Sequence, residues 1–153
     1  MGATTAVSAK AHQPPRILII EDNPADVTLL RLALDQQGEE YQMHVLRDGA
    51  EALDFVQRQR IEPEVHRPCV IVMDMHLPKH DGRALLQAIR QTPVLENIQI
   101  VVLTGVAAPQ EEAEVKRLGI RLYQTKPIHL DGWIEMARKI LEICHDKDVL
   151  TAA

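Results

Sequence analysis

Five polar residues of this sequence stand directly after apolar runs, at four separate places along the chain. They are Glu21 and Asp22 after "ILII", Asp74 after "VIVM", Thr104 after "IVVL" and Lys126 after "RLYQT". An ionised carboxylate at the end of a buried segment needs a partner, a metal or an exposed mouth to be tolerated. Taken singly, each residue has an ordinary explanation, because Asp is common in loops and a lone Lys is usually a solvated charge. Their repetition indicates a shared site.

These residue types suit the transfer of a phosphoryl group to a carboxylate. Three carboxylates packed together repel one another and raise each other's pKa values unless a cation intervenes. Hard oxygen ligands favour Mg²⁺, which keeps several waters and usually also binds a phosphate. A carboxylate can attack phosphorus to form an aspartyl phosphate, and the phosphoryl oxygens then require a cation and a hydroxyl donor. Lys126 and Thr104 supply these two groups.

Short apolar segments alternate with helix-like segments along most of the chain. Strands are expected at 17–20, 41–48, 69–73, 98–103 and 121–125, and helices at 24–37, 49–60, 82–93, 109–119 and about 130–144. This alternation predicts an α/β protein with a parallel sheet and helices on both of its faces. Ligands of such sheets bind beyond the carboxyl ends of the strands. We therefore expect the five polar residues to converge on one edge of the sheet.

Four motifs make the chain similar to the receiver domains of two-component response regulators over residues 16–145. They are "LIIEDNPAD", "IVMDMHLPKHDG", "VVLTG" and "YQTKP". The resemblance implies a flavodoxin-like, doubly wound, five-stranded parallel sheet in the order 2-1-3-4-5, with five helices. Residues 15–148 are then expected to form the receiver domain, between a disordered tail at 1–14 and a C-terminal tail at 149–153.

The resemblance implies roles for the residues that would handle the phosphoryl group. Asp74 matches the phosphoacceptor, Thr104 would hydrogen-bond the phosphoryl group, and Lys126 would pair with it. Tyr123 matches the aromatic switch position, which would follow a shift of Thr104, although an ordinary half-buried strand tyrosine is the alternative. The Lys126–Pro127 bond is expected to be cis, an isomer that only X-Pro bonds adopt cheaply.

The resemblance also implies a Mg²⁺ site and a means of setting the phosphate's lifetime. Asp22 and Asp74 would bind the metal directly, Glu21 would act through its water shell, and a backbone carbonyl of the Met75–His76 region, assigned to His76, would be a further ligand. The side chains of His76 and Val106 occupy positions that flank the path of the hydrolytic water. We expect these two side chains to set the lifetime of the phosphate without abolishing its formation.

Composition and charge exclude several other classes of protein. The net charge of −5 argues against a nucleic-acid-binding surface, and no apolar run reaches the ~18 residues that a membrane span needs. A cytoplasmic protein is the expectation. Cys69 and Cys144 lie far apart in apolar segments, and we expect both to be small buried hydrophobes in a reducing cytosol.

The last expected helix has an unusually wide apolar face. Apolar residues cover about half of its circumference, whereas a stripe that faces a core needs only about 100°. The surplus is assigned to an edge made of Trp133, Met136, Ile140 and Ile143. We expect this edge and the fifth strand to form a homodimer interface, and the alternative is a helix that packs more deeply against its neighbours.

The leading functional hypothesis is a stand-alone response regulator that signals through protein contacts. It would accept a phosphoryl group from a phosphohistidine of a sensor histidine kinase, and it would catalyse only its own phosphorylation and dephosphorylation. A narrower resemblance, in "EDNPADV", an expected Pro-containing loop at 61–68 and "LPKHDGRALLQAIR", indicates a bacterial phytochrome kinase as the donor. One alternative is an interaction module that binds its partner regardless of phosphate. A flavin or nucleotide binder is disfavoured because the chain lacks a Gly-rich phosphate loop and stacking aromatics.

Overall fold

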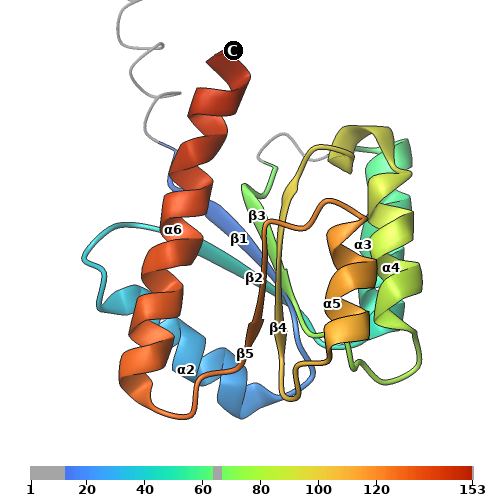
Figure 1. The fold of residues 1–153 in the computed structure, drawn as a ribbon. Helices are drawn as coiled ribbons and strands as arrows, with labels where there is room; N and C mark the ends of the chain where they lie inside the picture. The colour runs from blue at the N-terminus through green and yellow to red at the C-terminus, as the bar shows by residue number, and fades with distance from the viewer. Residues whose placement is uncertain (1–12, 64–66, 153) are drawn as a thin grey trace, which may run out of the picture.

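A five-stranded parallel sheet forms the centre of the protein (Figure 1). The computed structural model describes residues 13–63 and 67–152, with side chains described through residue 146; most of the expected N-terminal tail and part of the expected loop at 61–68 lie outside these ranges. The strands run in the order β2-β1-β3-β4-β5, as predicted. Their bounds are β1 Arg16–Ile20, β2 Gln42–Leu46, β3 Val70–Met73, β4 Gln99–Thr104 and β5 Leu122–Thr125.

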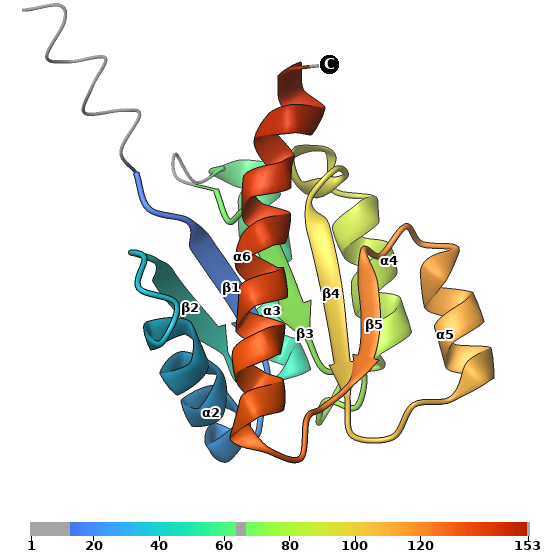
Figure 2. The same ribbon diagram turned by 60° about the vertical axis from the view of Figure 1, so that its left-hand side comes forward.

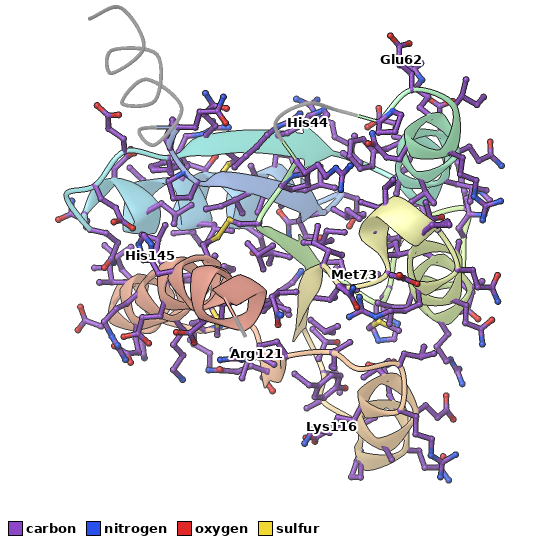
Figure 3. The ribbon with its side chains drawn as sticks, turned by 90° about the horizontal axis from the view of Figure 1, so that it is seen from above. His44, Glu62, Met73, Lys116, Arg121 and His145 are labelled. Carbon is purple, nitrogen blue, oxygen red and sulfur yellow. A yellow bond between two sulfur atoms is a disulfide. The ribbon has the colours of Figure 1, made fainter. Side chains whose placement is uncertain are left out.

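Helices cover both faces of the sheet. Helices α2 and α6 pack on one face, and α3, α4 and α5 lie on the other (Figures 1 and 2). Viewed from above, the sheet passes between the two layers, with His145 marking one layer and Lys116 the other (Figure 3). The bounds are α2 Pro24–Asp35, α3 Gly49–Ile61, α4 Gly82–Arg90, α5 Pro109–Lys116 and α6 Leu130–Ala152, with a short 3₁₀ turn, η1, at Pro93–Leu95.

The core is aliphatic and divides into two clusters, one on each face of the sheet. All four residues of β3 are buried, and so are the last four of β1, because both strands are covered on both faces. Successive side chains alternate between the clusters, as Ile71 and Val72 illustrate. Burial of these unbroken Val, Ile and Leu runs fixes the strands whose ends carry the polar residues.

Local sequence signals define where the helices begin. Asn23 caps α2 by accepting hydrogen bonds from the backbone N–H groups of Ala25 and Asp26, and Pro24 occupies the first turn. Asp48 and Asp81 cap α3 and α4 in the same way. Helix α5 differs, because Ala108 precedes it and no side chain of that residue can cap it.

Helix α6 corrects the predicted dimer surface. It runs to Ala152, well past the expected end near Cys144, so most of the expected C-terminal tail is helical. The side chains of its wide apolar face are buried in the chain's own core, with 6% of their surface exposed or less: Trp133, Met136, Ile140 and Ile143. Helix α2 and strands β3 and β4 cover this face. The helix therefore packs more deeply than expected, and these four residues are not available to a second copy.

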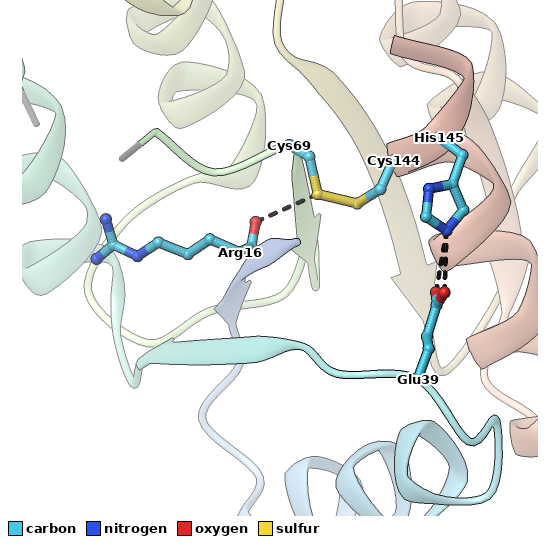
Figure 4. Close-up of a disulfide and its surroundings, with 5 residues drawn as sticks. All are labelled: Arg16, Glu39, Cys69, Cys144 and His145. Atoms are coloured by element: carbon cyan, nitrogen blue, oxygen red, sulfur yellow. Dashed lines mark hydrogen bonds and ion pairs between the residues drawn. A yellow bond between two sulfur atoms is a disulfide. The ribbon is translucent and has the colours of Figure 1, made fainter. Parts of the chain in front are cut away.

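The two cysteines are also a correction, because Cys69 and Cys144 form a disulfide (Figure 4). Seventy-five residues separate them in the sequence, but β3 begins beside the turn of α6 that carries Cys144, and the two Cα atoms lie 5.1 Å apart. The next residue of α6, His145, pairs with Glu39 at 3.0 Å (Figure 4). The disulfide thus joins the residue directly before β3 to α6, the helix that covers this strand.

Two further observations concern the backbone. Among the described residues no peptide bond is cis, so the expected cis bond between Lys126 and Pro127 is wrong. The trans isomer is the ordinary state of an X-Pro bond, and the chain here passes from β5 to α6 in that state. None of the helices in the described part of the chain combines the length and the apolar character that crossing a membrane would require.

Candidate functional site

The carboxyl ends of the four strands that the sequence singled out meet at one edge of the sheet. Ile20 of β1 pairs with Met73 of β3, and the N–H of Asp74 donates to the carbonyl of Ile20 at 3.1 Å. On the other side Thr104 of β4 pairs with Thr125 of β5. Strands β1 and β3 are neighbours from which the chain winds outward in opposite directions, the place where ligands bind in open α/β sheets.

Three carboxylates lie together at this edge, as the sequence predicted. Glu21, Asp22 and Asp74 each offer an oxygen within 4.8 Å of the others. Glu21 and Asp74 are buried, whereas Asp22 is exposed at the mouth of the cluster. Oxygen donors that are close together and partly open to solvent suit a hard divalent cation that retains part of its water shell. The donor set therefore fits a Mg²⁺-like ion.

Lys126 supplies the positive charge inside this cluster. Its Nζ donates to Asp74 Oδ2 at 2.9 Å and to Asp26 Oδ2 at 2.7 Å, and it also contacts Glu21. Asp26 was not predicted as a site residue. It lies in the first turn of α2, where an acidic residue is favoured by the helix dipole alone, and this ordinary explanation concealed its contact with Lys126.

The pKa values of the two innermost groups, Glu21 and Lys126, are both raised, for different reasons. Burial raises the pKa of Glu21 to about 8, although its hydrogen bond with Lys126 acts in the opposite direction. Burial alone would lower the pKa of Lys126, but hydrogen bonds to Asp26, Glu21 and Asp74 outweigh it and raise that pKa. Lys126 is therefore a cation at neutral pH, and the raised pKa of Glu21 comes mainly from its burial, with the charge of Asp74 as a smaller cause.

The acceptor candidate Asp74 is held from two sides. Its Oδ2 accepts from Lys126, and its Oδ1 accepts from the backbone N–H of His76 at 2.9 Å. The loop that follows reaches this position by a close approach, because a Cβ on Gly82 would lie 2.5 Å from the carbonyl oxygen of Met75. Thr104 is fully buried, and its hydroxyl donates to the carbonyl of Val106 at 3.2 Å.

Tyr123 points its hydroxyl at the start of α5. The hydroxyl donates to Glu111 Oε1 at 2.8 Å and accepts from the N–H of Ala108 at 3.1 Å. Burial and the neighbouring Glu111 raise the pKa of Tyr123, against the lowering effect of the Ala108 N–H. The ring packs against the core cluster on this face of the sheet. Glu111, like Asp26, is an acidic residue of a first helical turn that the sequence did not single out.

The cavity below the carboxylates is too small for a flavin. Its lining includes Glu21, Asp26, Asp74 and Lys126 among apolar residues, and its volume is about 20 Å³, enough for about one water molecule. A cavity of this size is compatible with a small hard ion and with a phosphoryl group attached at the protein surface. It is too small for an aromatic cofactor.

Comparison with known proteins identifies the family of the chain. The model of the response regulator receiver domain matches residues 17–138 of the chain. This chain belongs to the response regulator receiver domain family. The matched span of the receiver domain contains all five of the polar residues at the sheet edge, and it reaches well into α6.

The proteins similar to this chain include other response regulators, one of them named as a phytochrome response regulator. The chain is 33% identical to response regulator Rcp1 from Synechocystis sp., over 96% of this chain and 100% of that protein. The crystal structure of the Mn²⁺-bound form of Rcp1 superimposes with a TM-score of 0.72, at 35% identity over 83% of this chain and 91% of that one. The phosphorylated cyanobacterial phytochrome response regulator RcpA gives a TM-score of 0.77, at 31% identity over 88% and 96% of the two chains.

Proposed function

We propose that Asp74 of this response regulator accepts a phosphoryl group from a phosphohistidine of a sensor histidine kinase. The observation that carries the proposal is the position of Asp74, a buried carboxylate held by Lys126 and the His76 N–H beside Glu21 and Asp22. In the reaction a carboxylate oxygen of Asp74 forms a bond to phosphorus as the bond between phosphorus and the imidazole nitrogen breaks. The imidazole leaves with the electron pair of that bond and takes up a proton.

The site's own residues perform most of the work that this reaction requires. The contacts of both oxygens hold the Asp74 carboxylate in one orientation before the donor arrives, which lowers the entropic part of the barrier. Lys126 already lies at this carboxylate and is placed to pair with an incoming phosphoryl oxygen. Thr104, at the end of β4, would exchange its bond with the Val106 carbonyl for one to the phosphoryl group.

We further propose that the divalent ion of this site is Mg²⁺. Asp22 and Asp74 would bind it directly, Glu21 through water, and the backbone carbonyl of His76 would complete the protein's ligands. The metal, when bound, neutralises phosphoryl oxygens in the transition state. The Mn²⁺-bound form of the relative Rcp1 supports a divalent ion at this type of site.

In this role the protein is a signalling component that catalyses only its own phosphorylation and dephosphorylation. The side chains of His76, in the loop after β3, and of Val106, after the end of β4, are both largely exposed. Both are placed to control how water reaches an acyl phosphate. The phytochrome association of RcpA supports a phytochrome-linked histidine kinase as the donor. A cytoplasmic location follows from such a donor.

Intact-mass spectrometry after incubation with acetyl phosphate and MgCl₂ tests the proposal. We expect one added phosphoryl group on the native chain and none after chelation of the metal. Asp74→Asn should abolish the adduct, and Asp54→Asn, which alters an exposed carboxylate of α3, should retain it. A native chain that never gains a phosphoryl group, yet still binds its partner, would favour the phosphorylation-independent interaction module.

A further inference from the structure

Glu111 of α5 contacts two residues of the site that lie in separate elements. One oxygen of its carboxylate, Oε1, accepts the hydroxyl of Tyr123 from β5 at 2.8 Å. The other, Oε2, lies 3.5 Å from Nε2 of His76, in the loop after β3. The Glu111 side chain is only 14% exposed, whereas that of His76 is 62% exposed, so the contact with Tyr123 is the better shielded of the two.

The same contacts connect the phosphoacceptor to the start of α5. His76 donates its backbone N–H to Asp74 Oδ1, while its ring contacts Glu111. Tyr123 receives the N–H of Ala108, directly before α5, while it donates to Glu111. A displacement of His76 relative to Asp74 therefore changes the group that holds the Tyr123 hydroxyl.

Helix α5 has few other attachments that would resist such a change. Val115 is the only residue of the helix that is buried, and Ala108 provides no side-chain cap. The ion pair between Arg83 of α4 and Glu114 of α5 is exposed on both sides, and pairs of that kind contribute little to stability. The contacts of Glu111 and Tyr123 thus make up a large part of what fixes the first turn of α5.

We propose that Glu111 is a positioning residue that holds Tyr123 and His76 in the arrangement of the unphosphorylated protein. The inference rests on the proposed phosphorylation of Asp74. A phosphoryl group bonded to Asp74 turns its carboxylate into an acyl phosphate, so the oxygen that the His76 N–H now contacts becomes a weaker acceptor, and the group adds negative charge close to a loop that already faces the Glu111 carboxylate. Both effects displace His76 from Glu111, and Tyr123 and the first turn of α5 are released together.

A spectroscopic label on Tyr123 tests this arrangement. The chain contains two tyrosines, so Tyr41→Phe leaves Tyr123 as the single site for 3-fluorotyrosine. Beryllofluoride with MgCl₂ serves as the phosphoryl mimic, and ¹⁹F NMR follows the tyrosine. We expect the mimic to shift the Tyr123 signal. In Glu111→Gln the chemical shift of Tyr123 without beryllofluoride should already be displaced toward its value in the beryllofluoride-bound protein. The control is Glu112→Gln, which alters the neighbouring acidic residue paired with Lys116 and should behave as the parent does.

The affinity for beryllofluoride separates positioning from simple stabilisation. Because Glu111 favours the unmodified arrangement, its removal should tighten binding, by roughly threefold to tenfold for a coupling of about 1 kcal/mol. A residue that merely stabilised the fold would leave the affinity unchanged or weaken it. Tyr123→Phe should have the same effect, and the double variant should show less than the sum of the two changes.

The outcomes distinguish the inference from the function on which it rests. A Tyr123 signal that responds to beryllofluoride identically in the parent and in Glu111→Gln, with equal affinities, overturns the role of Glu111 and leaves the proposed function intact. Failure of all variants to bind beryllofluoride and to gain a phosphoryl group from acetyl phosphate overturns the proposed function, and the inference with it.

Discussion

Nζ of Lys126 lies 2.9 Å from Oδ2 of Asp74, so the lysine is hydrogen-bonded to the proposed acceptor carboxylate in the unphosphorylated protein. The same ammonium group contacts Glu21 and Asp26, which makes Lys126 the counter-charge of three carboxylates at this edge of the sheet. The proximity of three carboxylates is tolerable because one side chain neutralises part of their charge.

Replacing this lysine should make the fold depend on a divalent cation. We expect Lys126→Met to lower the free energy of unfolding by about 2 to 3 kcal/mol without metal, because it leaves carboxylates crowded and unpaired. Millimolar Mg²⁺ should restore part of the loss, since it replaces the missing positive charge. Urea unfolding with and without MgCl₂ measures both effects. Lys79→Met, which removes an exposed lysine, is the control and should change little; equal losses in the two variants would contradict the prediction.

Reduction of the disulfide should destabilise the protein strongly. The bond between Cys69 and Cys144 closes a loop across a sequence separation of 75 residues, and a loop of that size corresponds to about 4 kcal/mol of stability in the chain-entropy model. Urea unfolding in the presence and absence of dithiothreitol measures the difference. A variant with Cys69→Ala and Cys144→Ala should unfold at one urea concentration under both conditions. A native chain whose unfolding is also insensitive to dithiothreitol would show that the bond contributes no stability.

His44 should add a pH dependence to the stability of the sheet edge. Burial and the nearby guanidinium of Arg16 lower the pKa of His44, and its Nδ1 accepts from Arg16 at 3.1 Å, which a protonated ring cannot do. The unfolded chain, with an ordinary pKa near 6.5, takes up a proton before the folded one does. The stabilisation of the fold by neutral His44 is therefore complete above about pH 6.5. It is lost as the pH falls from there through the lowered pKa of His44 in the folded protein.

A His44→Gln variant isolates this contribution. The free energy of unfolding, measured from pH 7.5 down to pH 5, should fall more steeply for the native chain than for the variant, because the carboxylates that titrate in both proteins cancel in the comparison. Parallel curves over this range would show that His44 titrates alike in the folded and unfolded chains.

Arg90 lies far from the acidic site, and its removal should strongly lower the free energy of unfolding. Its guanidinium donates to four backbone carbonyls, those of Glu96, Ile98, Leu118 and Gly119, in the loops that precede β4 and β5. Arg90→Met leaves these acceptors unsatisfied, and we expect a loss of about 3 kcal/mol in urea unfolding. Arg58→Met, which breaks only an exposed pair with Asp54, should cost less than about 0.5 kcal/mol. Similar losses in both variants would contradict the prediction.

The parts of the fold that follow from local patterns could be predicted from the sequence. Unbroken apolar runs such as "VIVM" determine the buried strands, and Asn23 with Pro24 marks the start of α2. The convergence of Glu21, Asp74 and Lys126 follows from parallel topology, because every strand ends at the same edge of the sheet.

The contacts that were missed depend on distances between residues that the sequence pattern does not contain. Asp26 and Glu111 each have an adequate local reason to begin a helix, so nothing in the sequence indicated their contacts with Lys126 and Tyr123. Pairing of the cysteines required knowledge of which turn of α6 faces β3. The width of an amphipathic helix, likewise, does not reveal how deeply it packs, and this is why Trp133 and its neighbours were assigned to a surface.

The disulfide also makes the molecule mechanically asymmetric. On one face of the sheet, α6 is bonded covalently to the residue before β3, and the ion pair of His145 with Glu39 lies beside this link (Figure 4). The ion pair of Asp146 with Arg121 holds the same turn of α6. On the opposite face, a few polar side chains hold the first turn of α5. A distortion that starts at Asp74 therefore meets more resistance from α6, on one face of the sheet, than from α5, on the other. We expect α5 to move more easily. Oxidation of the two cysteines should therefore direct motion as well as add stability, because it prevents the helix behind the sheet from yielding first.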